Sequence, residues 1–169
     1  MGQTLIRYHN ISPEAIAALL SGGVAVDPTN LKRDVAQTAL TIANICRAAK
    51  RNMMGLVVDS FDTLDGIDRN RSSGYLHNAS FGRIDGGMIT SIPIQSINPA
   101  FATLFVEDNP GPGVITYYLS RDDGNTWTQV QPGVEADLSS QPPGNALRIK
   151  AELSGDAYIG GWALIWLSP

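Results

Sequence analysis

The sequence predicts a mainly β protein, an antiparallel β-sandwich or jelly roll preceded by N-terminal α-helices. From residue 53 onward, short apolar runs alternate with Gly, Pro, Ser and Thr, and this spacing is typical of sandwiches. Before residue 53 the chain is rich in Ala, and its apolar residues recur at helical spacing. We therefore divide the chain into an N-terminal helical arm, residues 1–52, and a β-sandwich domain, residues 53–169.

Two helices are expected in the arm. Ser12, Pro13 and Glu14 are typical of a helix start, because Ser can cap the helix and Pro suits its first position. This short helix ends by Gly22, and a second helix extends from about residue 31 to about residue 51.

The second predicted helix is apolar on two sides. One side has the spacing of a coiled-coil seam and consists of Leu31, Val35, Thr38, Ile42, Ile45 and Ala49. The neighbouring side carries smaller residues, namely Ala36, Ala39, Leu40, Ala43 and Cys46. A helix of this kind either joins subunits or packs against its own domain, and the pattern leaves both possibilities open. We interpret the seam as an oligomerisation surface and Cys46 as a small buried apolar residue.

Seven strands are expected in the β domain: Gly55 to Asp59, Met88 to Ile94, Ala102 to Glu107, Ile115 to Ser120, Trp127 to Val130, Ala146 to Leu153 and Ala157 to Leu167. The alternation in "LRIKAEL" predicts one buried face and one solvent-exposed face with Arg148, Lys150 and Glu152. The turn residues at 154–156 predict that the last two strands form a C-terminal hairpin.

The last predicted strand is apolar on both faces. Trp162, Leu164 and Trp166 alternate with Ala163, Ile165 and Leu167. Both faces therefore need a covering layer, and either the N-terminal helix or a neighbouring subunit could supply the second one.

The segment "SRDDGNTW", residues 120–127, fits the Asp-box pattern S-x-D-x-G-x-T-W of sialidases and other carbohydrate-active proteins. We expect a structural turn made by Ser120, Asp122, Gly124, Thr126 and Trp127, because the polar groups can bond the turn backbone and Gly permits a positive φ. Only one copy occurs, and a propeller of four to eight blades of about 40 residues does not fit in the predicted β domain, residues 53–169.

No catalytic or metal-binding group is predicted. His9 and His77 lack the flanking signature of a nucleophile triad. Asp59, Asp62, Asp65 and Asp68 follow at intervals of three, which departs from the spacing of an EF-hand loop, so a solvated turn is the preferred interpretation over a calcium site. We expect no metal, no cofactor and no enzymatic activity.

The charge and the hydropathy of the chain argue against two classes of partner, nucleic acid and the membrane interior. A net charge of -4 and a pI of about 5.0 argue against nucleic acid, which requires a cationic surface. No apolar run approaches the roughly 20 residues of a membrane span.

Four segments, in order, resemble a known family. They are "NMMGLVVDSFDTLDGID", "GGMITSIPIQSINPAFATLFVED", "ITYYLSRDDGNTWTQV" and "LRIKAELSGDAYIGGWALIW", and together they span residues 52 to about 167. They resemble the β-domain of tail-fibre and other virion-surface proteins of tailed bacteriophages. Asp123 departs from that pattern, which more often has Gly. The resemblance implies a location on the virion surface, as a tail or capsid appendage, and assembly into homotrimers with other virion proteins as partners.

We therefore expect a non-enzymatic structural component of a virion, such as a tail fibre, spike or fibre-attachment protein, that serves particle assembly and attachment to a host-surface glycan. The alternative is a carbohydrate-binding module without catalysis that uses Tyr117, Tyr118 and Trp127. A third interpretation, a small glycan hydrolase, needs two paired carboxylates, and the sequence pairs none of its glutamates.

Overall fold

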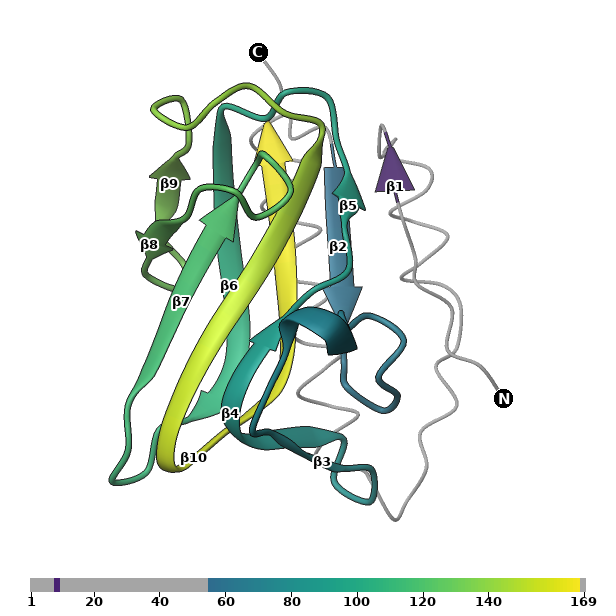
Figure 1. Cartoon of the computed structure of the whole chain (residues 1–169), viewed down its shortest axis with the longest axis vertical. Helices are drawn as coiled ribbons and strands as arrows, with labels where there is room; N and C mark the ends of the chain where they lie inside the picture. The colour runs from purple at the N-terminus through teal and green to yellow at the C-terminus, as the bar shows by residue number, and fades with distance from the viewer. Residues whose placement is uncertain (1–7, 10–54, 168–169) are drawn as a thin grey trace, which may run out of the picture.

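The computed structural model describes residues 8–9 and 55–167, which form a mainly β structure with antiparallel strand pairing (Figure 1). The strands are β1 (Tyr8–His9), β2 (Gly55–Asp59), β3 (Leu76–Asn78), β4 (Arg83–Thr90), β5 (Ile94–Gln95), β6 (Phe101–Asn109), β7 (Ile115–Ser120), β8 (Thr128–Val130), β9 (Glu135–Asp137) and β10 (Ala146–Leu167). One turn of 3-10 helix, η2, spans Arg69–Arg71. The predicted mainly β class is confirmed.

The longest strand, β10, belongs to two layers. In Figure 1 it runs down the front of the molecule, turns over and returns behind, between β2 and β6. Its first half, up to Leu153, pairs with β7 on one edge and with β4 and β5 on the other. Its second half, from Tyr158, pairs with β6 on one edge and with β2 on the other, while the start of β4 pairs with Tyr158 and Ile159.

The predicted C-terminal hairpin is therefore wrong. The chain does reverse at residues 154–157, where Gly155 has a φ of 62°, but the two halves of β10 do not pair with each other. Each half already has a hydrogen-bonded neighbour on both edges. The halves face each other across the core instead, and side chains from both belong to one apolar cluster.

Other predicted strands agree with the structure to different degrees. The predictions for β2 and β7 have the observed bounds, and those for β6 and β8 are correct within two residues. The prediction for 88–94 is wrong in part, because β4 begins at Arg83 and ends at Thr90, and Ile94 belongs to β5. Pro93 lies in the interruption, where it has no N–H to give to a ladder. Strands β1, β3 and β9, which have two or three residues each, were not predicted.

The core lies between the two halves of β10. Leu147, Ile149, Ala151 and Leu153 point into it from the front layer, and Trp162, Leu164 and Trp166 from the rear layer. Phe61 is fully buried and meets Trp162 edge to face, with 4.9 Å between ring centroids. Edge-to-face aromatic pairs add about 1 kcal/mol to the free energy gained by burial alone.

The rear layer has a second apolar face. Leu56, Ala163 and Ile165 are 1%, 0% and 1% exposed, yet they lie outside the core cluster. The strand register places Leu56 beside Ile165, and Thr103 and Phe105 beside Ile165 and Ala163 on the same face. The prediction that the last strand is buried on both faces is confirmed.

The two predicted N-terminal helices, and with them the seam from Leu31 to Ala49 and Cys46, lie outside the described residues. Within residues 8–9 and 55–167, no helix is long and apolar enough to cross a membrane.

Candidate functional site

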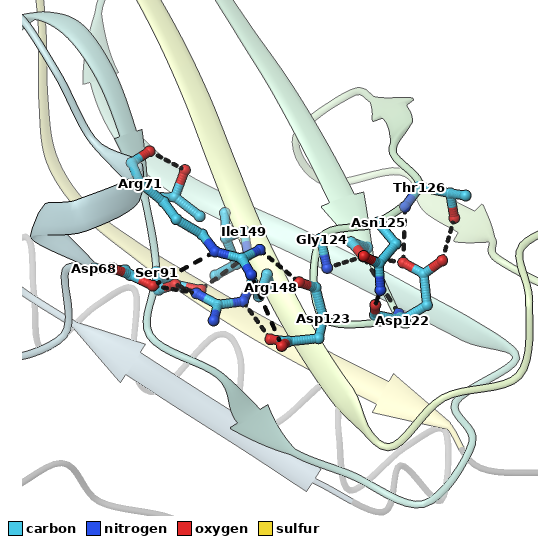
Figure 2. A network of polar contacts seen from close by, with 12 residues as sticks. Asp68, Arg71, Ser91, Asp122, Asp123, Gly124, Asn125, Thr126, Arg148 and Ile149 are labelled. Atoms are coloured by element: carbon cyan, nitrogen blue, oxygen red, sulfur yellow. Dashed lines mark hydrogen bonds and ion pairs between the residues drawn. The ribbon is translucent and has the colours of Figure 1, made fainter.

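The Asp-box turn between β7 and β8 is closed by its own side chains (Figure 2). Asp122 accepts hydrogen bonds from the Thr126 amide and hydroxyl at 2.9 and 2.8 Å and from the Ser120 hydroxyl at 2.7 Å. The Ser120 hydroxyl in turn accepts from the Gly124 amide at 2.8 Å. Burial acts to raise the pKa of Asp122, but the bonds from Thr126 and Ser120 outweigh it and hold that pKa below its usual value.

Gly124 is required for two reasons. Its φ is 83°, in the left-handed region, and a Cβ there would lie 2.7 Å from the Arg71 guanidinium and 3.0 Å from the Trp127 ring. The Trp127 ring lies beside the turn at Gly124 and is half-buried. The five residues predicted to build the turn are therefore brought together by the structure.

Arg148 joins the Asp-box turn to the loop that follows β2. It is buried, and its guanidinium donates to Asp123 at 2.6 Å, to Asp68 at 2.8 Å and to the Ser91 carbonyl at 2.7 Å (Figure 2). Arg71 also donates to the Asp123 carbonyl, at 2.6 Å. Asp68 further accepts from the Asn70 amide at the start of η2. Three segments far apart in sequence thus share one polar network.

The charges in this network are matched. Burial acts to raise the pKa of Asp68, but the hydrogen bond and the charge of Arg148 lower it below its usual value. Asp123 has a φ of 62°, a conformation that favours Gly. The ion pair with Arg148 gives this position a reason to carry Asp in place of Gly. The expectation that Arg148 faces solvent is wrong, because ion pairing allows the side chain to be buried.

Arg121, inside the Asp box, anchors the long loop before β10. The side chain is 5% exposed and donates to four backbone carbonyls, those of Pro99, Ser139, Gln141 and Pro142. The Arg121 amide donates to the Gln141 side chain at 2.8 Å. A planar guanidinium with five donors can bind several carbonyls at once, which an ammonium cannot do in the same plane. Sequence reasoning missed this residue, because Arg inside a polar turn motif suggests exposure.

The outer face of the front layer presents two aromatic side chains. Tyr118 on β7 is directly opposite Lys150 on β10, and the Lys150 ammonium lies 4.1 Å from the Tyr118 ring centroid and 5.1 Å from that of Trp127. Glu152 binds Lys150 at 2.8 Å and accepts from the Tyr118 hydroxyl at 3.3 Å. The result is a half-buried aromatic and charged patch beside the Asp box, made of Tyr118, Trp127, Lys150 and Glu152.

Tyr117, the third aromatic residue proposed for glycan binding, points the other way. It is 4% exposed in the core, and its hydroxyl donates to Asp108. Burial, followed by the bond to Asp108, raises the pKa of Tyr117. Tyr117 therefore cannot form a ligand platform with Tyr118, because neighbouring residues of a strand face opposite sides.

The predicted solvated turn of four aspartates is a loop with its own internal bonds. Asp59 accepts from the Phe61 amide at 3.0 Å, Asp62 accepts from the Ser60 hydroxyl at 3.0 Å, and Asp68 belongs to the Arg148 network. His77 shares a hydrogen bond of 2.7 Å with the Phe61 carbonyl. Within residues 8–9 and 55–167, no three His, Cys, Asp or Glu side chains are grouped as metal ligands would be. These residues hold the loop in place.

Comparisons with protein-family models, with curated proteins and with solved structures found no match.

Proposed function

We propose that this protein is a non-enzymatic structural component of a bacteriophage virion, a tail fibre, spike or fibre-attachment protein. Its residues 53–169 form a β-sandwich, and its arm joins copies of the chain into a homotrimer. The resemblance of four consecutive segments to virion-surface β-domains suggests this role. The structural observation that carries the proposal is the polar network around the Asp box, in which Asp122, Asp123 and Asp68 are bound by neighbouring protein groups.

The polar contacts support a structural role for the Asp box. The carboxylates of Asp68, Asp122 and Asp123 all bond neighbouring protein groups. Bonds of this kind fix the loops at one end of the sheet against β10. A rigid module of short strands and pinned loops suits a particle exposed to proteases outside the cell.

The oligomeric state of the full chain tests the proposal. Light scattering at micromolar concentration is expected to give about three times 18.1 kDa. Ile42→Glu, in the predicted seam, should dissociate the trimer, while Gln37→Glu, on the polar side of the same helix, should leave it intact. A monomeric wild-type chain would contradict the proposed homotrimer. Labelling the chain in assembled particles would then establish its place on the virion.

A carbohydrate-binding module is the second candidate, because Tyr118 and Trp127 lie at the surface beside Glu152. Both rings are near the Lys150 ammonium, so a sugar would have to use the remaining ring surface. Titration with host polysaccharides should change Trp emission if this candidate is correct, and Tyr118→Ala should abolish the change. A constant emission across a polysaccharide panel would leave only the structural role.

A further inference from the structure

The second apolar face of the rear layer is made of residues that the structure describes. Its centre consists of Leu56, Thr103, Ala163 and Ile165, which are all at most 5% exposed. Phe105 and Val58 extend it along β6 and β2, since both pair with Ala163. Phe101, at its margin, is 38% exposed. Large apolar side chains dominate this surface, and they require a cover that excludes water.

The course of the chain shows which segment is close enough to cover it. Strand β1 pairs with β2, so that Tyr8 is opposite Leu56 and His9 is opposite Gly55. Residues 10–54 therefore leave the rear layer at this edge and return to the same edge. Only residues 52–54 separate the predicted helix end at about residue 51 from Gly55. A connection this short places a helix against the sheet that follows it.

The dimensions agree as well. A helix over residues 31–51 is about 30 Å long at 1.5 Å per residue. The second half of β10, Tyr158–Leu167, is about 33 Å long at 3.3 Å per residue. One helix can therefore cover this half-strand along its whole length.

Charge complementarity selects the same segment. Glu107, Glu135 and Asp137 lie along the β6 and β9 side of the apolar face, because they follow the alternation of Phe101, Thr103 and Phe105 or pair with those residues. The segment 31–51 carries five basic residues and one acidic residue, Asp34. Helical spacing puts three of the basic residues, Lys32, Arg47 and Lys50, on the same side as the small residues.

Side-chain volume decides which side of the helix faces the sheet. Its small-residue side, Ala36, Ala39, Leu40, Ala43 and Cys46, lets the helix approach closely. The sheet supplies the bulk through Leu56, Phe105 and Ile165. Large residues opposite small ones fill an interface to native density. The seam from Leu31 to Ala49 then faces away from the sheet.

We propose that the second apolar face of the rear layer binds residues 31–51 of the same chain through their small-residue side, which leaves the seam free to contact other copies. Each of the two apolar sides of the helix then has its own role. The inference concerns contacts within one chain, so it stands independently of the oligomeric state proposed above.

Cross-linking to the single native cysteine, Cys46, tests this arrangement in the full chain. Thr103→Cys places a thiol at the centre of the face, and Thr116→Cys, on the outer face of the front layer, is the matched control. Oxidation or a short bis-maleimide should link Cys46 to position 103 within one chain and leave position 116 unlinked. If Thr103→Cys unfolds the protein, Phe101→Cys at the exposed margin replaces it.

Isotope mixing separates the possible results. Isotope-labelled and unlabelled chains are unfolded together, refolded and cross-linked. The masses of the linked peptides are then measured by mass spectrometry. Links only within labelled or within unlabelled chains support the proposal. Links between labelled and unlabelled chains would mean that a second copy covers the face and would overturn it, as would the absence of any link at both positions 103 and 101. A trimer without links within one chain refutes this inference alone, and a monomer with such links refutes only the proposed trimer.

A pair of charge substitutions gives an independent readout. Ala39→Glu puts a carboxylate on the side that faces the sheet and should lower the melting temperature by about 5 °C or more. Gln37→Glu, on the polar side, should leave it within about 1 °C. Equal melting temperatures for the two variants would contradict the docking of the small-residue side.

Discussion

Replacing Asp122 should destabilise the domain in a way that depends on pH. Its carboxylate accepts three hydrogen bonds within the turn, two from Thr126 and one from Ser120. At about 1 kcal/mol each, Asp122→Ala should cost about 3 kcal/mol of unfolding free energy at pH 7. Asp122→Asn keeps an acceptor for the Thr126 amide and loses the charge, so it should cost about half as much.

The sign of the pH dependence follows from the lowered pKa of Asp122. A group whose pKa is lower in the folded state contributes stability above its unfolded pKa, which is about 4. That contribution is lost as the pH falls through the folded pKa. The difference in stability between wild type and Asp122→Asn should therefore be largest at pH 7 and should shrink steadily below pH 4.

Urea denaturation followed by Trp emission measures both quantities, since Trp162 is buried in the core. Asp156→Asn is the matched control, because Asp156 is exposed in the turn of β10. A loss below about 0.5 kcal/mol for Asp122→Ala, or a difference that stays constant down to pH 2, would refute this account of the turn.

Three further substitutions have defined outcomes. Burial is the main cause that raises the pKa of Asp59 to about 6. The stability that the protonated carboxyl contributes at low pH is therefore lost between about pH 4 and pH 6. Asp59→Asn should add about 2 kcal/mol to the unfolding free energy at pH 7 and nothing at pH 3, as measured by urea titration. A lysine at position 121 cannot reach the four carbonyls together, so Arg121→Lys should lower the unfolding free energy by about 2 to 4 kcal/mol and speed protease cleavage within residues 138–144. Arg69→Lys is the control, because Arg69 is exposed. Equal cleavage rates for the two variants would count against the anchoring role. Gly87→Ala should lower the melting temperature far more than Gly133→Ala. Both glycines have a positive φ, but only a Cβ at position 87 would lie 2.3 Å from the backbone of a neighbouring loop. Similar decreases for the two variants would show that backbone strain, and not the close approach, determines the loss of stability.

Local pattern was sufficient to predict most strands. The bounds of β2 and β7 follow from apolar runs of five or six residues that end at turn residues. The hairpin prediction failed because a turn at residues 154–156 reveals where the chain reverses but not which strands become neighbours. That choice depends on β4, β6 and β7, which are distant in sequence from each half of β10.

In the candidate site too, contacts between residues near in sequence were predictable and contacts between distant residues were not. The bonds among Ser120, Asp122, Gly124 and Thr126 span four residues at most, so the motif predicts them. The ion pair of Arg148 with Asp68 joins residues 80 positions apart, and alternation alone assigned Arg148 to the solvent side. Two buried arginines, each with several hydrogen-bond partners, are the feature that a single sequence does not reveal.

β10 follows in the sequence all the strands with which it pairs, and this order has a consequence for folding during synthesis. Strands β2, β4, β6 and β7 emerge from the ribosome earlier, and each of them uses β10 as a neighbour. Until residue 167 has been made, both layers lack the strand that joins them, so the nascent domain has no complete core. The domain therefore cannot complete its fold before residue 167 has been made, and a chain that stops at residue 159 would leave β2 and β6 with open edges that favour aggregation.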